Sequence, residues 1–120
     1  TLEVLLQPAG APEPVLLSRT NARHLYWSMA QQLAHHASNG CPFELGDLLA
    51  SGTISGPAPD SLGCLLELTR RGQQPLTLPD GTTRAWLEDG DTVIMRGYAQ
   101  KEGLRIGLGE VRGTVLPAAE

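Results

Sequence analysis

Two short stretches of the sequence carry side chains whose types suit ligand binding or proton chemistry. Residues 51–57 (Ser-Gly-Thr-Ile-Ser-Gly-Pro) alternate small hydroxyl residues with glycines, so backbone amides and hydroxyls could approach a ligand carboxylate closely. Glu67 lies within residues 64–69, where strand alternation would place it on the face opposite Leu66 and Leu68. Spacing alone favours a turn for the first stretch and a solvent-facing side chain for Glu67. A Glu67 that is held by a partner is the alternative.

The three histidines and a pair of aspartates have simpler interpretations. His35 and His36 are adjacent, so on a helix they point about 100° apart, and His24 precedes them without a spacing that metal ligands use. We interpret the histidines as a partly exposed helix face. Asp89 and Asp91 flank a glycine, but the remaining positions of a calcium loop do not follow. This stretch predicts a hairpin turn.

The composition is that of one β-rich domain or part of one. The 120 residues include 14 Gly and 9 Pro, which are too many for a helical bundle and typical of short strands joined by tight turns. A formal net charge of −4 without a basic run argues against a nucleic-acid partner. The apolar runs are far shorter than the ~20 residues that span a bilayer, so we expect a soluble protein without a membrane partner.

Two details of the chain bear on its compartment and extent. Cys41 and Cys64 are too few and too far apart for a zinc cluster or a redox pair, and we expect reduced thiols in a cytoplasmic protein. The sequence opens at Thr1 on an apolar run, without a charged leader. This start suggests a cut chain rather than a native N-terminus.

One helix and several strands are expected to position these residues. Apolar residues recur every four positions within residues 23–38, with Asn21 as N-cap and Gly40 as a left-handed stop, and predict the only convincing helix. Asp80 and Gly81 predict a tight hairpin turn. The predicted fold class is therefore mainly β with one α-helix (α+β). Strands are expected at residues 1–7, 15–18, 47–55, 65–71, 76–78, 84–87, 92–98 and 104–116.

The stretches that carry chemistry belong to a longer pattern that closely resembles the fumarylacetoacetase family. The resemblance runs from about His24 to the end of the chain, and residues 51–57 make it specific, because other members of the superfamily usually carry a shorter Thr-Gly-Thr-Pro version there. The matching stretches are residues 24–27 (HLYW), 31–36 (QQLAHH), 39–41 (NGC), 46–57 (GDLLASGTISGP), 66–68 (LEL), 89–91 (DGD), 105–107 (RIG) and 115–117 (VLP).

The resemblance implies a fold, an activity and partners. It implies that residues 1–120 are the C-terminal segment of a catalytic domain with a mixed β-roll or sandwich, in a cytoplasmic homodimer. It implies hydrolysis of the C–C bond of a small-molecule substrate, fumarylacetoacetate, to fumarate and acetoacetate in tyrosine and phenylalanine breakdown. A Ca²⁺ or Mg²⁺ ion held by carboxylates would stabilise the departing enolate, and a histidine would activate the attacking water.

The same resemblance assigns roles to two residues of this chain. Glu67 matches the glutamate that orients the catalytic histidine, and Thr53 matches a threonine that contacts substrate. The family's metal ligands, catalytic histidine and remaining substrate contacts all precede the matched region, so we assign no metal ligand here. None of His24, His35 and His36 matches the catalytic histidine. We therefore expect the isolated chain to be inactive without the rest of the catalytic domain.

Two alternatives stay open at this point. A different reaction of the same superfamily, such as acylpyruvate hydrolysis, decarboxylation or isomerisation, would use a similar segment. A binding or structural β-domain could also have kept this sequence without the chemistry. An upstream segment that bears a Glu-x-Glu pair and further carboxylates would favour the enzyme.

Overall fold

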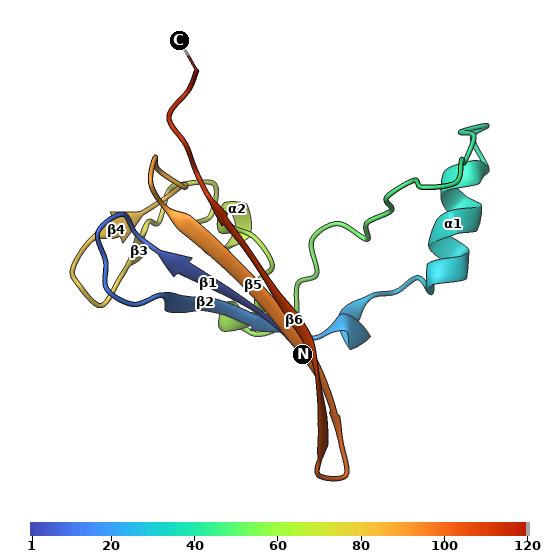
Figure 1. Ribbon diagram of the computed structural model, residues 1–120, viewed down its shortest axis with the longest axis horizontal. Coiled ribbons are helices and arrows are strands. Elements are labelled where there is room, and N and C mark those ends of the chain that lie inside the picture. The colour runs from blue at the N-terminus through green and yellow to red at the C-terminus, as the bar shows by residue number, and fades with distance from the viewer. Residues whose placement is uncertain (120) are drawn as a thin grey trace.

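A four-stranded antiparallel sheet forms the body of the computed structural model, which describes residues 1–119 (Figure 1). The strand order is β2-β1-β5-β6, so the first strand of the chain pairs with a strand from its last third. The predicted strands in these four places are confirmed. Their bounds are Leu2–Gln7 for β1, Val15–Thr20 for β2, Thr92–Lys101 for β5 and Leu104–Thr114 for β6.

The small core lies along the two inner strands. Leu6 and Ile94 are almost completely buried, and Leu5 pairs directly with Ile94 across the β1–β5 ladder. Burial of such a side chain contributes roughly 1.5–3 kcal/mol, so the apolar run from which the first strand was predicted supplies part of the core. The connection from β1 to β2 begins at Pro8, whose carbonyl accepts a hydrogen bond from the Ala11 amide at 3.0 Å.

A buried carboxylate joins three strands. Glu3 of β1 lies directly opposite Arg19 of β2 on one side and Arg96 of β5 on the other. Its Oε1 accepts from the Arg19 Nε at 2.8 Å, and its Oε2 accepts from the Arg96 Nε at 2.7 Å. Both oxygens of Glu3 are therefore paired, as a buried charge requires.

A second, two-stranded sheet confirms the predicted Asp-Gly hairpin. Strand β3 (Leu76–Thr77) pairs with β4 (Thr83–Arg84). Gly81 adopts a φ of 86°, which glycine tolerates without strain, and its amide donates to the carbonyl of Leu78 at 2.9 Å. Asp80 Oδ1 accepts from the Thr82 amide at 2.9 Å, as expected of an aspartate at a turn.

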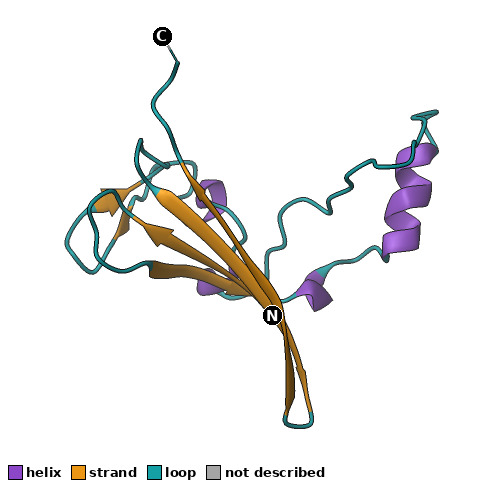
Figure 2. Ribbon diagram, in the orientation of Figure 1, coloured by secondary structure: helices purple, strands orange, loops and turns teal. Residues whose placement is uncertain are grey.

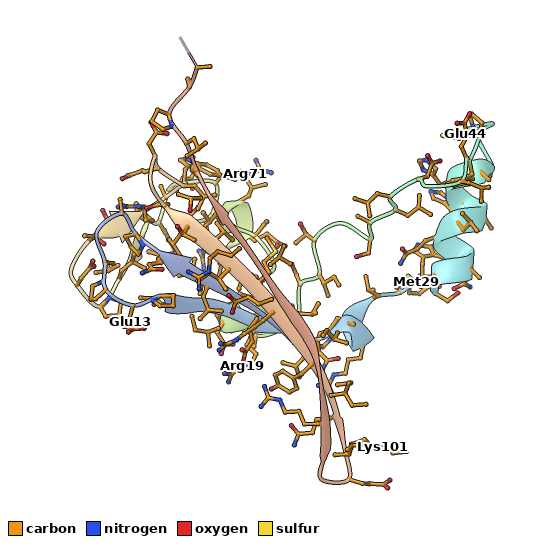
Figure 3. The ribbon with its side chains drawn as sticks, viewed as in Figure 1. Glu13, Arg19, Met29, Glu44, Arg71 and Lys101 are labelled. Atoms are coloured by element: carbon orange, nitrogen blue, oxygen red, sulfur yellow. The ribbon has the colours of Figure 1, made fainter. Side chains whose placement is uncertain are left out.

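The β5–β6 hairpin extends well beyond the rest of the sheet, and Figure 3 places Lys101 at its tip. Glu102 and Gly103 turn the chain there with φ values of 51° and 84°. Strand β6 is exposed along its whole length and forms one edge of the sheet. Toward the tip of the hairpin, the Arg105 guanidinium lies 3.7 Å from the centre of the Tyr98 ring, a cation–π contact.

The predicted helix over residues 23–38 is shorter and starts later than expected. A 3₁₀ turn, η1 (Ala22–His24), comes first and is capped by Asn21, and the α-helix α1 occupies only Met29–Ala37. Ser28, not Asn21, is the N-cap of α1, and it exchanges two hydrogen bonds with Gln31 in a capping box. The predicted end is confirmed, because Gly40 has a φ of 85°.

Two predicted strands are wrong. Residues 47–55 form an irregular loop, seen as an extended teal segment in Figure 2, because no strand among the described residues pairs with them. Residues 65–71 contain a single helical turn, α2 (Leu65–Leu68), followed by a turn. Leucine and glutamate favour helix, and Thr69 Oγ1 donates to the carbonyl of Leu65 at 2.7 Å at the end of that turn. A second 3₁₀ turn, η2 (Pro59–Ser61), precedes α2.

Residues 22–52, which we call the arm, project away from the sheet (Figure 1). The arm carries α1, with Met29 and Glu44 far from the body in Figure 3. It exposes several large apolar side chains: Tyr26, Trp27, Met29, Leu33, Leu45, Leu48 and Leu49. None of the helices within residues 1–119 has the length and apolar character that crossing a membrane requires. The predicted fold class, mainly strands with one main helix, is confirmed.

Candidate active site

Thr53 and Glu67 line the same pocket, although fourteen positions separate them in the sequence. The pocket has a volume of about 550 Å³ and opens widely to solvent. Thr53 comes from the loop that returns from the arm to the body, and Glu67 comes from α2. The remaining lining residues are His24, Leu25, Tyr26, Ile54, Ser55, Cys64 and Leu66.

Glu67 is exposed to solvent and hydrogen-bonded at the same time, so both interpretations from the sequence describe part of its environment. Ser55 Oγ donates to Glu67 Oε2 at 2.6 Å, and Cys64 Sγ donates to the same oxygen at 3.4 Å. Ser55 Oγ also accepts from the Gly63 amide at 3.0 Å. Glu67 is thereby connected to the loop that carries Thr53.

These contacts favour the charged form of the carboxylate. The Ser55 hydroxyl is the main reason that the pKa of Glu67 lies below its ordinary value, with partial burial opposing the shift and Cys64 and the Gly63 amide supporting it. Glu67 is therefore ionised at neutral pH. An ionised carboxylate at an open pocket can accept a hydrogen bond from a cationic or neutral N–H donor.

The position of Thr53 depends on a close backbone approach at Gly63. A Cβ atom on Gly63 would lie 2.6 Å from the Ile54 carbonyl oxygen and 2.6 Å from the Thr53 Cγ2. Real Cβ atoms do not come so near to other heavy atoms, so only glycine allows the two loops to pack at this distance. Thr53 itself is exposed, with its hydroxyl available to a ligand.

The histidines lie in different surroundings. His24 lines the pocket, and its Nε2 would lie 3.1 Å from a Cβ on Gly56. His35 stacks on Trp27 at 6.1 Å between ring centres, and the ring centre of His36 lies 5.2 Å from that of Phe43. His35 and His36 lie on α1, far from α2 and its Glu67 (Figure 1).

The described part of the chain does not by itself hold a cluster of side chains that fits a divalent cation. Within residues 1–119, no group of three or more His, Cys, Asp or Glu side chains is close enough to hold a metal ion. The Ser55 hydroxyl and the Cys64 thiol donate hydrogen bonds to the Glu67 carboxylate, and they do not join it in a set of cation ligands. Cys41 and Cys64 are both free thiols.

Sequence reasoning missed Ser55, Cys64 and His24 as members of this site. The only local signal was the position of Cys64 three residues before Glu67, which brings the two together on one helical turn but not on a strand. Ser55 could not be paired with Glu67, because their contact depends on how a loop packs against α2. His24 was assigned to a helix face, whereas it ends a 3₁₀ turn beside the pocket.

Known proteins resemble this chain over almost its whole length. Residues 13–116 match the family described as "Fumarylacetoacetate (FAA) hydrolase C-terminal". The chain is 50% identical to the fumarylacetoacetase of Arabidopsis thaliana over 118 residues and 50% identical to that of Homo sapiens over 117 residues. It is 53% identical to "Fumarylacetoacetase fahA" of Aspergillus fumigatus over 117 residues.

These alignments cover 98% of this chain in each case. They cover 28% of the plant and human proteins and 27% of the fungal protein, so the chain spans little more than a quarter of the length of these relatives. The match includes the loop that carries Thr53 and the helical turn α2 that carries Glu67. The chain belongs to the fumarylacetoacetate hydrolase family.

Proposed function

We propose that the complete protein, meaning the whole gene product that includes this chain, hydrolyses fumarylacetoacetate to fumarate and acetoacetate. The observation that carries the proposal is the shared pocket of Thr53 and Glu67, within a chain about 50% identical to proteins named fumarylacetoacetase. The reaction adds water across a C–C bond and would serve tyrosine and phenylalanine breakdown in the cytoplasm. Residues 1–120 would be the C-terminal segment of the catalytic domain and part of its β-roll.

Glu67 orients a histidine that another part of the complete protein supplies. That histidine removes a proton from the water that attacks the substrate carbonyl, and it becomes a cation in doing so. An ionised carboxylate that accepts the other ring N–H stabilises this cation and fixes the tautomer. The lowered pKa of Glu67 supports the role, because the carboxylate then stays charged across the physiological pH range.

Thr53 contacts the substrate at the mouth of the same pocket. Its hydroxyl can donate to a carboxylate or carbonyl oxygen of fumarylacetoacetate, which carries both. Support comes from the exposure of Thr53 and from the packing at Gly63, which fixes the backbone beneath it. A hydroxyl on a fixed backbone positions a substrate at a low cost in entropy.

Further parts of the complete protein are needed for this activity. We propose a bound Ca²⁺ or Mg²⁺ whose ligands lie outside this chain, and such an ion supplies charge stabilisation to an enolate. We also propose a homodimer in which the rest of the catalytic domain and the partner subunit cover the arm. The exposed apolar side chains of the arm support this, with Tyr26 87% and Leu48 96% exposed.

The deciding experiment compares fumarylacetoacetate hydrolysis, with added Ca²⁺ or Mg²⁺, by the complete protein and by the isolated chain. We expect metal-dependent cleavage by the complete protein only. Replacement Glu67→Gln removes the charge but keeps the shape, and should lower kcat by about a hundredfold. The matched control is Glu102→Gln at the hairpin tip, where the side chain is 84% exposed and no effect is expected.

Two results would contradict the proposal. Cleavage by the isolated chain would mean that the catalytic residues have been misplaced. Failure of the complete protein to cleave fumarylacetoacetate, combined with cleavage of an acylpyruvate or with no reaction at all, would assign it to another superfamily reaction or to a non-catalytic role.

A further inference from the structure

Ser55 links the loop that carries Thr53 to the helical turn α2 that carries Glu67. It follows Thr53 by two residues on the same loop, and its side chain reaches across to α2. Its hydroxyl makes two hydrogen bonds in opposite senses, because it accepts from the Gly63 amide at 3.0 Å and donates to Glu67 Oε2 at 2.6 Å. The ionised carboxylate can only accept, so the single hydroxyl proton of Ser55 points toward it, while the amide donates to a lone pair of the same oxygen.

The two contacts leave one oxygen of Glu67 available. Ser55 and Cys64 both donate to Oε2, and within residues 1–119 no hydrogen bond to Oε1 is found. The O–H donor at 2.6 Å is the stronger of the two, because S–H is a weak donor and its distance is 3.4 Å. Ser55 therefore dominates the orientation of the carboxylate.

We propose that Ser55 is a positioning residue, whose hydroxyl holds Oε2 of Glu67 and leaves Oε1 to accept a hydrogen bond from the catalytic histidine. This inference rests on the proposed role of Glu67. Ser55 orients the carboxylate, and a chain of hydrogen bonds runs from the Gly63 amide through Ser55 to Glu67. Each donor in the chain favours the ionised carboxylate.

The surroundings of Glu67 contain few competing charges. The titratable side chains that line the same pocket are His24, Tyr26 and Cys64. No ion pair joins Glu67 to any Lys, Arg or His within residues 1–119 under a 4.0 Å limit, so hydrogen bonds rather than a neighbouring cation hold it. Removal of the Ser55 hydroxyl should therefore raise the pKa of Glu67.

The test uses Ser55→Ala and Ser55→Thr in the complete protein. Titration of the Glu67 carboxyl carbon by ¹³C NMR, with its signal identified by its loss in Glu67→Gln, gives the pKa. We expect Ser55→Ala to raise this pKa toward the ordinary glutamate value of about 4.3. We expect kcat/KM to fall by about tenfold, with the acidic limb of its pH profile moved upward. Ser55→Thr keeps the hydroxyl and should restore both quantities.

Ser55→Cys keeps a similar volume and a weak S–H donor, so its pKa and kcat/KM should lie between those of wild type and Ser55→Ala. If Ser55→Ala does not fold, Ser55→Cys is compared with wild type instead. An unchanged Glu67 pKa in folded Ser55→Ala, or a Ser55→Thr protein no better than Ser55→Ala, would overturn the proposal. If wild type itself fails to cleave fumarylacetoacetate, the proposed function fails, but the NMR titration still decides whether Ser55 holds Glu67.

Discussion

Arg84 holds Asp91 with two of its nitrogens, with Nε 2.9 Å from Oδ2 and Nη2 3.2 Å from Oδ1. Asp91 is completely buried and also accepts hydrogen bonds from the backbone amides of Glu88 and Ala9, at 3.0 Å and 3.4 Å. One carboxylate thus joins the small hairpin, the turn before β5 and the end of β1. Burial raises the pKa of Asp91, but the hydrogen bonds from Arg84 and Glu88 outweigh it and the net pKa is lowered.

Replacement of Arg84 by alanine should leave this buried charge unpaired. Loss of one partner of a buried ion pair costs about 3 kcal/mol or more, so we expect the melting temperature of the complete protein to fall by several degrees in calorimetry. The control is Arg112→Ala, because Arg112 pairs with Glu110 at 3.3 Å on an exposed strand and should contribute little. Equal effects of the two substitutions would contradict the structural importance of Asp91.

Glu3 should make the stability of the sheet depend on pH. Its pKa is lowered chiefly by the hydrogen bond from Arg96, with burial opposing and Arg19 assisting. A group whose pKa is lower in the folded state stabilises the fold fully above its unfolded pKa of about 4.3, and this stabilisation is lost as the pH falls through the folded pKa. The melting temperature of wild type, measured by calorimetry, should therefore lie several degrees above that of Glu3→Gln at pH 7. This difference in melting temperature should become smaller below pH ~4.

The matched control for that comparison is Glu13→Gln. Glu13 is exposed in the connection between β1 and β2, as Figure 3 shows, and its substitution should leave the melting temperature unchanged at each pH. A gap between wild type and Glu3→Gln that stays constant from pH 7 to pH 3 would mean that Glu3 acts through its shape and not through its charge.

Thr53→Val should weaken substrate binding. The variant keeps the branched shape but loses the hydroxyl, which as one hydrogen bond is worth about 1 kcal/mol. Steady-state kinetics of the complete protein should show KM raised by about fivefold to tenfold, with kcat less affected. Thr53→Ser keeps the hydroxyl and should stay near wild type. If Ser and Val variants are equally impaired, the methyl group and not the hydroxyl is what matters at this position.

Gly63→Ala should move the loop that carries Thr53. Its new Cβ would meet the Ile54 carbonyl at 2.6 Å, and backbone atoms cannot yield as a flexible side chain can. Overpacking of this kind costs about 1–3 kcal/mol, so both the melting temperature and kcat/KM should fall. Gly107→Ala on β6 is the control, since nothing lies within 4 Å of its Cβ position. A wild-type kcat/KM in Gly63→Ala would show that this packing is dispensable.

The sequence predicted those parts of the fold in which local signals and tertiary contacts agree. The Asp80-Gly81 turn and the strands β1, β2, β5 and β6 are of this kind. Prediction failed where a strand pattern had no partner strand, as in residues 47–55, and where a brief apolar alternation belonged to a helical turn, as at Leu65–Leu68. In both cases the deciding contacts lie outside the segment itself.

Two residues of the candidate site could be predicted from the sequence, but the contacts around them could not. Thr53 and Glu67 were singled out by resemblance to a family, while spacing alone favoured a turn and a solvated side chain. Their shared pocket depends on Gly63, where two loops approach too closely for a Cβ, and on the hydroxyl of Ser55. A one-dimensional pattern cannot show such contacts, because neither residue has an unusual local neighbourhood. The roles of Thr53 and Glu67 stay predictions.

The pairing of β1 with β5 has a consequence for how the chain is made. Leu2 pairs with Gly97 and Gln7 pairs with Thr92, so more than 80 residues separate the partners and β5 must leave the ribosome before the inner ladder can form. The β1–β2 hairpin can form early, but the backbone N–H and C=O groups along the other edge of β1 then stay unpaired until β5 emerges. Closing so long a loop slows folding, and this interval is when nascent chains are most exposed to aggregation and to chaperones.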